Sequence, residues 1–343
     1  MSKIVYLLGA GASYGTRDKD NKKRILTGIP VVNEIKVELE NLIDLLSSWS
    51  LIDKDMEDSK QRLVKDFQDL KDACSVNSTI DTYAKKLWLQ GKKEDFARVE
   101  LELTMFFILE QIIHKPDRRY DTFLANVLQR ENEWYDKLIL PDDIRILSWN
   151  YDNQLELVYR EYLEKNYSVI REILGIYDVK SDEKERSLKD KCSIIKLNGT
   201  ANFLKEEDWL QYSGIDKIDD TMLGNILKKY TECLIAGRCE GRLRLNFAWE
   251  ERWSEDMLNK RIPNMVRDAT ALVVIGYTFP YFNRKIDRVV FKEMSNLKNI
   301  YIQDPYADRI KQNIIPVMPN DKLTYIKIHT LNDVDQFFLP PEL

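Results

Sequence analysis

Short apolar runs recur along the chain, and helical patterns separate several of them. Six runs are rich in β-branched residues, which is typical of strands buried on both faces of a sheet. They cover residues 3–8, 144–148, 193–197, 271–275, 299–303 and 324–328. Residues 284–294 and 307–313 show apolar positions at helical spacing. Strands that alternate with helices are joined by right-handed crossovers, so the pattern predicts an α/β fold with a doubly wound, mostly parallel, Rossmann-like sheet.

Two long segments interrupt this alternation. Residues 32–140 are mostly helical and include a broad apolar face between Phe96 and Ile113. Residues 201–262 are dense in aromatic side chains, which is typical of a small subdomain or of the wall of a substrate pocket. We therefore expect residues 1–343 to form a single Rossmann-type domain with a large helical insertion at 32–140 and a smaller insertion subdomain at 201–262.

Composition and charge exclude several classes of protein. The net charge of -5 gives no general attraction to a phosphate backbone, so we expect no direct binding to nucleic acid. The four cysteines match no metal-knuckle spacing and only two histidines are present, so we expect no metal site. The sequence shows no signal peptide and no long apolar run. These features predict a cytoplasmic protein with reduced thiols and no membrane contact.

Four short motifs stand at the ends of predicted strands or in the turns that follow them. They are Gly9-Ala10-Gly11-Ala12-Ser13, Gly28-Ile29-Pro30, Asn150-Tyr151-Asp152 and Gly276-Tyr277-Thr278-Phe279. Ligands of a doubly wound sheet collect at the carboxyl edge of its strands. In the first motif, glycines let the backbone approach a pyrophosphate while the N–H groups of the next helix point at its negative charge. Together the motifs predict a nucleotide site with a catalytic amide.

The first motif departs from the fingerprint of dinucleotide-binding dehydrogenases. That fingerprint has a third glycine at the sixth position, and Tyr14 occupies this position here. Hydride transfer is therefore disfavoured. A lone Gly-Ala-Gly turn is equally compatible with a structural turn or an unrelated nucleotide site, so the interpretation depends on the whole set of motifs.

Taken in order with Lys196-Leu197-Asn198-Gly199-Thr200, the four motifs resemble the sirtuin superfamily, specifically the sirtuin-like NAD-hydrolysing domains of bacterial antiphage defence. The resemblance spans residues 3–305 without the two insertions. It implies that NAD is the substrate, that no metal takes part, and that each matching position has a role. The implied catalytic residues are Asn150, Asp152 and Asn198. The implied cofactor-binding residues are Gly9, Ala10, Gly11, Ser13, Gly28, Ile29, Pro30, Gly276, Thr278 and Asp304.

The implied chemistry is cleavage of the nicotinamide–ribose bond. This reaction passes through an oxocarbenium-like centre, and the leaving group is already cationic, so little general acid is needed. Asn150 would orient water or the ribose hydroxyls, and Asp152 would hold the nicotinamide carboxamide. Asn198 stands where the family commonly has a histidine that accepts a proton from ribose. Because hydrolysis by a positioned water tolerates the loss of this base better than deacylation does, a hydrolase is favoured.

The resemblance therefore implies an NAD glycohydrolase that acts as a regulated effector of abortive infection, as a homo-oligomer or with a separate sensor or regulatory subunit. Two alternatives stay open: a catalytically degenerate module that binds NAD or ADP-ribose, and an NAD-dependent protein deacylase. Structural interpretations of single residues also stay open. Pro30 can shape a turn, Asp152 can cap the helix that begins near Asn153, and Thr278 can satisfy a backbone group.

Overall fold

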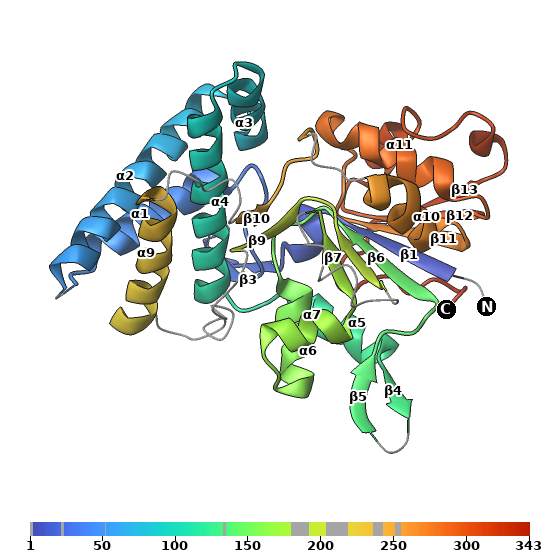
Figure 1. The fold of residues 1–343 in the computed structure, drawn as a ribbon. Coiled ribbons are helices and arrows are strands. Elements are labelled where there is room, and N and C mark those ends of the chain that lie inside the picture. Colours follow the sequence, from blue (N-terminus) through green and yellow to red (C-terminus); the bar gives the residue numbers. More distant parts are fainter. Residues whose placement is uncertain are drawn as a thin grey trace. The chain divides into compact units, whose positions relative to one another are not determined.

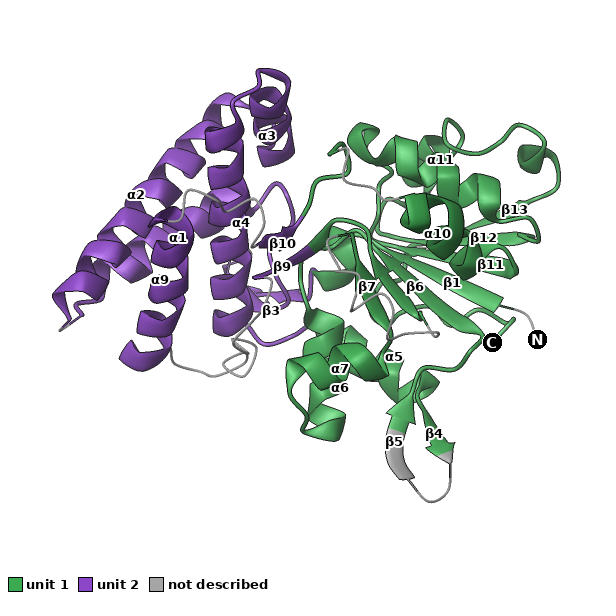
Figure 2. Ribbon diagram, in the orientation of Figure 1, with its two compact units in different colours: residues 1–13, 117–199, 246–343 green, residues 14–116, 200–245 purple. Residues whose placement is uncertain are grey.

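The computed structural model describes residues 3–21, 24–51, 53–132, 135–179, 192–203, 219–235, 243–250 and 255–343. The chain divides into two compact units (Figure 2). The first contains residues 1–13, 117–199 and 246–343, and the second contains residues 14–116 and 200–245. Residues 117–140 of the predicted helical insertion thus belong to the first unit. Within the predicted smaller insertion, residues 204–218, 236–242 and 251–254 lie outside the described residues.

The first unit is built on a seven-stranded sheet in which every neighbouring pair of strands is parallel. Its strands are β1 (Lys3–Leu8), β6 (Ile144–Ser148), β7 (Ile176–Asp178), β8 (Ile194–Lys196), β11 (Ala269–Ile275), β12 (Asn299–Gln303) and β13 (Lys327–Leu331). Their order across the sheet is β13-β12-β11-β1-β6-β8-β7. The chain extends the sheet from β1 to one side and then returns to β11 on the other. The predicted doubly wound α/β fold is confirmed, with its topological switch point between β1 and β11.

Strand β1 shows why both faces of the sheet are covered. Ile4, Tyr6 and Leu8 belong to one hydrophobic core, whereas Val5 and Leu7 belong to the other. One core is covered by α5 (Arg118–Val127), α6 (Gln154–Leu163) and α7 (Tyr167–Ile173), and the other by α10 (Ile262–Val266), α11 (Arg284–Glu293) and α12 (Ala307–Ile314) (Figure 1). A parallel strand buried on both sides has a continuous apolar sequence, which is the pattern seen at this strand. The unit also carries a hairpin of β4 (Gln129–Asn132) and β5 (Tyr135–Ile139) and a π-helical turn at Met257–Arg261.

The last strand lies later in the chain than the predicted range of 324–328. β13 begins at Lys327, and Lys322–Thr324 form a short 3-10 turn instead. The Nζ atom of Lys322 donates hydrogen bonds of 2.6 Å to the carbonyls of Phe291 and Met294 at the end of α11. These bonds satisfy carbonyls that the helix leaves unpaired, and they hold this segment in a turn. The correction therefore comes from a contact with a distant helix end.

Strand β7 at the edge of the sheet was not predicted. It has only three residues and ends in Asp178, whose carboxylate pairs with Arg171 at 2.8 Å in a buried position. A run this short that ends in a charge has no strand signature in the sequence. Its place in the sheet depends on pairing with β8.

The second unit is mostly helical. It contains α1 (Ile35–Ser48), α2 (Lys54–Val76), α3 (Ile80–Leu89), α4 (Lys93–Ile113) and α9 (Asp220–Ile235), the antiparallel pair β2 (Thr16–Arg17) and β3 (Ile25–Thr27), and the pair β9 (Gly199–Phe203) and β10 (Leu243–Leu245), with Gly199 itself in the first unit. Every residue of α4 from Val99 to Ile112 is buried, and the helix contacts α2, α3, α9 and β10. Buried all round, α4 is the central helix of this unit. None of the helices in the described part of the chain has the length and apolarity needed to cross a lipid bilayer.

Candidate functional site

The turns after four neighbouring strands begin side by side at the carboxyl edge of the sheet. Leu8 at the end of β1 pairs with Ile275 of β11 on one side and with Ser148 of β6 on the other. Ser148 in turn pairs with Lys196 at the end of β8. Because these strands are parallel and in register, the motifs that follow them meet at the switch point, where doubly wound sheets bind ligands.

The glycine turn after β1 packs directly against the turn after β11. The N–H of Gly11 donates to the carbonyl of Gly276 at 3.0 Å. A Cβ atom on Gly9 would lie 2.5 Å from the Gly276 oxygen, and one on Gly276 would lie 2.3 Å from the Gly11 Cα atom. Gly276 also has a φ of 58°, a backbone conformation that residues other than glycine rarely adopt. Contact between the two turns therefore requires glycine at these positions, and the contact of the first motif with a pyrophosphate stays a prediction.

The helix expected directly after the first motif is replaced by a single 3-10 turn, Ala10–Ser13. After Ser13 the chain enters the second unit, and α5 provides the helix that precedes β6. Arg119 in the first turn of α5 donates from Nη2 to the carbonyl of Gly11 at 2.9 Å. Asp117 accepts from Arg119 Nε at 3.0 and 3.1 Å and so fixes the guanidinium. The glycine turn is thus held by a positive side chain that no motif had indicated.

Ser13 and Asn150 bring the first and third motifs together. The side-chain amide of Asn150 donates to Ser13 Oγ at 3.1 Å, and the hydroxyl of Tyr120 lies 3.0 Å from the same oxygen. Asn150 is 5% exposed and Ser13 is fully buried. The backbone N–H of Asn150 donates to the hydroxyl of Ser148 at 3.2 Å. The predicted catalytic amide is therefore fixed on both its side chain and its backbone.

Asp152 has one satisfied and one unsatisfied carboxyl oxygen. Its Oδ1 accepts the N–H of Gln154, the first residue of α6, at 3.0 Å, which supports the interpretation that Asp152 stabilises the start of this helix. No described residue donates a hydrogen bond to Oδ2, although the side chain is buried. Burial raises the pKa of Asp152, and the Lys196 ammonium and the hydrogen bond from the Gln154 N–H partly oppose this rise. One buried acceptor is left available for a ligand.

Asn198 and Asn246 add two further amide oxygens. Asn198 Nδ2 donates to the carbonyl of Trp149 at 3.0 Å, and the N–H of Asn246 donates to the carbonyl of Asn198 at 2.8 Å. Both side chains are buried, and neither Oδ1 atom has a hydrogen-bond partner in the described part of the chain. Buried polar atoms in native proteins are nearly always paired, so unpaired ones mark places where a polar ligand or water binds. Sequence reasoning missed Asn246, which belongs to none of the motifs.

A buried carboxyl group on α11 holds the turns after β6 and β11. Asp287 accepts the indole N–H of Trp149 at 3.2 Å and the hydroxyl of Tyr277 at 2.9 Å. The rings of Trp149 and Tyr277 stack with centroids 6.0 Å apart. Burial raises the pKa of Asp287 to about 8, even though the hydrogen bonds from Tyr277 and Trp149 lower it. Asp287 therefore positions Trp149, the residue directly before Asn150.

A cavity of about 420 Å³ lies beyond the ends of β11 and β12. It is lined by Thr278, Phe279, Pro280, Tyr281, Arg284, Asp304, Tyr306, Arg309, Ile310 and Asn313, and so includes two predicted cofactor-binding residues. Asp304 accepts the N–H of Tyr306 at 2.8 Å, and the carbonyl of Thr278 accepts from Asn313 at 2.9 Å. Phe279 has a φ of 54°, a strained conformation of the kind that clusters at functional sites. Arginine and tyrosine side chains equip such a cavity for anions and flat rings.

Gly28, Ile29 and Pro30 belong to the second unit, where they form a turn after β3. Gly28 has a φ of 82°, and its N–H donates to the carbonyl of Lys115 at 2.8 Å. Arg17 donates to the carbonyl of Ile29 at 3.2 Å, and the side chains of Ile29 and Pro30 are buried. These contacts support the interpretation that Pro30 helps to shape a turn.

Comparison of the sequence with protein-family models and with curated proteins finds no match. The fold and the site define the class: a doubly wound parallel α/β protein with buried, partly unsatisfied polar side chains at its switch point. This class of fold supports many chemistries, so the function must be argued from the site.

Proposed function

We propose that this chain is an NAD glycohydrolase, which cleaves NAD to nicotinamide and ADP-ribose. The observation that carries the proposal is the Asn150 amide, fixed by Ser13 and followed by the unsatisfied carboxyl oxygen of Asp152. This arrangement lies at the switch point, where doubly wound folds bind dinucleotides. It is also the arrangement that the resemblance to sirtuin-like hydrolases implies.

The proposed chemistry uses position and charge. Positive charge develops on the ribose as the bond to nicotinamide breaks, and a carboxylate at Asp152 would stabilise it. The unsatisfied Oδ2 of Asp152 can also accept a hydrogen bond from the nicotinamide carboxamide. Asn150 and the free amide oxygen of Asn198 would orient the attacking water and the ribose hydroxyls.

The cavity beside β12 supports a site long enough for a dinucleotide. The turn after β11 packs on Gly11 at one end and contributes Thr278 to the cavity at the other. A dinucleotide lying along this turn would place its nicotinamide end near Asn150 and its adenosine end beside Thr278 and Asp304. Arg284 and Arg309 would meet its phosphates or stack on its adenine.

The proposal extends to biology through the resemblance. We infer a role as an effector of abortive infection in antiphage defence, with activity controlled by homo-oligomerisation or by a separate sensor subunit. An unregulated enzyme of this kind would exhaust its own cell's NAD. Regulation of the activity is therefore part of the proposal.

One observation favours a second candidate, a module that binds NAD or ADP-ribose without cleaving it. Asn198 cannot act as a base, and its amide nitrogen is engaged by the Trp149 carbonyl. Among the described residues of the first unit, the only histidine is His329 in β13, and its ring stacks on that of Tyr301 in β12. The described residues of the first unit therefore give the site hydrogen-bonding groups but no imidazole.

Nicotinamide release from NAD tests both candidates. Purified protein, alone and with the products of neighbouring genes, is compared with Asn150→Ala and with Asn126→Ala, which removes an exposed amide on α5. We expect release by the wild type and by Asn126→Ala, and a loss of about 100-fold in Asn150→Ala. Calorimetric binding without release in any preparation would support the binding module. Release that requires an acetylated peptide would support a deacylase.

A further inference from the structure

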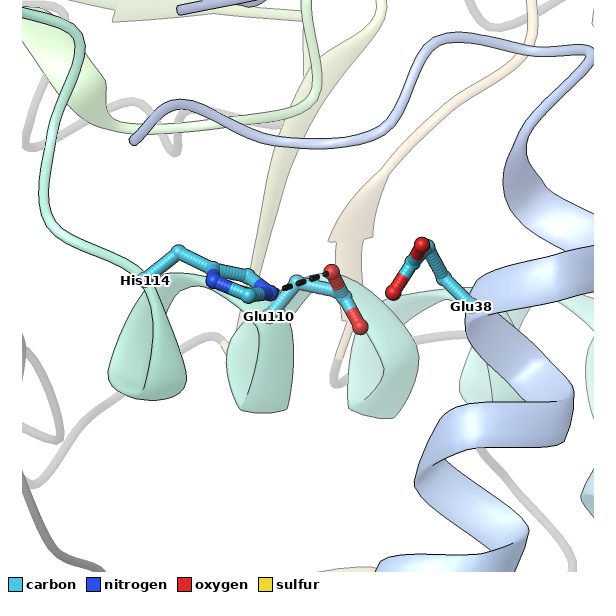
Figure 3. A group of neighbouring side chains, drawn as sticks. All are labelled: Glu38, Glu110 and His114. Carbon is cyan, nitrogen blue, oxygen red and sulfur yellow. Dashed lines mark ion pairs between the residues drawn. The ribbon is translucent and has the colours of Figure 1, made fainter. Parts of the chain in front are cut away.

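Three side chains with metal-ligating atoms meet inside the second unit (Figure 3). Glu38 comes from α1, and Glu110 and His114 come from the last turn and the end of α4. One ligand atom from each lies within 4.8 Å of the other two. Residues four apart on a helix face the same side, so the helical geometry of α4 presents Glu110 and His114 together. His114 Nε2 lies 3.4 Å from Glu110 Oε2.

The two carboxyl groups point toward each other (Figure 3). Both residues are almost completely buried, with Glu38 4% exposed and Glu110 1% exposed. Glu38 accepts a hydrogen bond from Asn41 at 2.9 Å, but no residue in the described ranges donates a hydrogen bond to Glu110 Oε2. Two carboxylates that face each other in a buried site repel each other, and a cation bound between them would offset this repulsion.

We propose that Glu38, Glu110 and His114 bind a divalent transition-metal ion. The chemistry of the ligands selects this class. An imidazole with two carboxylates suits ions such as Zn²⁺ and Mn²⁺, whereas Mg²⁺ and Ca²⁺ prefer oxygen ligands alone. The side chain of His114 is 15% exposed, which leaves access for water as a further ligand.

The separation of the ligand atoms is compatible with such an ion after small side-chain rotations. Ligands of a tetrahedral zinc ion lie about 3.4 Å apart, as metal–ligand distances of about 2.1 Å require. The ligand atoms of the three residues lie within 4.8 Å of one another. Rotation of the long Glu38 and Glu110 side chains can bring these atoms closer together, to the separation that the ion requires. The bound ion would replace like-charge repulsion with coordination and would tie α1 to the end of α4.

The site would also support the turn at Gly28. His114 is followed by Lys115, whose carbonyl accepts the N–H of Gly28 and which pairs with Thr27 in a parallel bridge. An ion that fixes the end of α4 would therefore also fix Lys115, to which the turn at Gly28 is hydrogen-bonded. The ion has a structural role in this proposal, independent of whether the chain cleaves NAD.

Metal binding by the full chain tests the inference. Protein treated with a chelator is titrated with Zn²⁺, Mn²⁺, Mg²⁺ or Ca²⁺ alone in a calorimeter, and the Mn²⁺ titration is repeated by electron paramagnetic resonance. We expect a single Zn²⁺ or Mn²⁺ per chain and a rise in Tm on binding. Glu110→Gln and His114→Asn should weaken binding by about 10-fold or more. Glu94→Gln, at an exposed carboxylate of the same helix, and His329→Asn, at the other histidine, should leave it unchanged.

Three outcomes would overturn the inference. They are a titration without heat or spectral change, equal affinity in the site variants and the controls, and preferential binding of Mg²⁺ or Ca²⁺. If Glu110→Gln does not fold, His114→Asn at the partly exposed end of α4 provides the same comparison. Since metal binding and Tm are measured without NAD, failure here is distinguishable from absence of NAD cleavage.

Discussion

The side-chain amide of Asn150 donates a hydrogen bond of 3.1 Å to the hydroxyl of Ser13, 137 positions earlier in the chain. This bond joins the turn after β1 to the turn after β6. The hydroxyl of Tyr120 on α5 lies 3.0 Å from the same Ser13 oxygen. The orientation of the amide is thus set by residues of two other segments. Positioning of this kind is what the proposed hydrolysis requires.

Ser13→Ala is expected to lower nicotinamide release by about 10-fold, mostly through kcat. The reason is that Asn150 loses the acceptor that orients its amide, while the groups that would hold the rest of NAD remain. Steady-state kinetics of the variant would separate kcat from KM. Ser295→Ala, at an exposed hydroxyl, is the matched control. An unchanged kcat in Ser13→Ala would contradict the positioning role.

Asn198→Ala is expected to reduce nicotinamide release by about 10-fold, less than Asn150→Ala. Asn198 is not a base, but its amide nitrogen donates to the Trp149 carbonyl, and its buried amide oxygen has no hydrogen-bond partner among the described residues. Release rates of the two variants, measured at equal protein concentration, test this order. Equal losses in both would contradict the smaller contribution expected for Asn198.

The stability of Asp287→Asn, measured relative to the wild type, is expected to increase as the pH rises from about 5 to 8. Burial raises the pKa of Asp287 to about 8 from an ordinary value of 3.8, so between these values the folded wild type binds a proton that the unfolded chain has lost. The wild type therefore loses stability as the pH rises through this range, by at most about 1.4 kcal/mol per pH unit, and an asparagine removes this loss.

Urea denaturation of wild type and Asp287→Asn at both pH values measures this difference. The difference between the free energies of unfolding of the two proteins cancels the contributions of all other titrating groups. Asp308→Asn, at an exposed position of α12, serves as the control and should follow the wild type. A constant difference between wild type and Asp287→Asn across the range would refute the assignment.

Gly276→Ala is expected to destabilise the fold by about 3 kcal/mol or more, or to prevent folding. A Cβ there would lie 2.3 Å from the Gly11 Cα atom, in a backbone conformation with φ of 58°. Gly224→Ala in α9 meets nothing within 4 Å and should stabilise the protein by about 0.5–1 kcal/mol because alanine favours helix. Chemical denaturation of both variants tests the contrast. Equal stability of Gly276→Ala and the wild type would rule out the proposed role of the turn contact.

The sequence by itself determined the central strands. The runs that became β1, β6, β11 and β12 are mostly apolar because both faces of a parallel strand are buried, and this pattern is local. Their alternation with helices also determined the doubly wound fold. The sequence placed Asn150 and Gly276 after strand ends, and therefore at the carboxyl edge of the sheet, by the same local logic.

Only the tertiary structure decided where the sheet ends and what holds the site. β7 depends on pairing with β8 and on the ion pair between Arg171 and Asp178, and β13 begins late because Lys322 bonds to the end of α11. Asp287 and Arg119 support the site through partners far away in sequence. A local pattern records which face of an element is buried, but it does not record which distant polar group will meet it there.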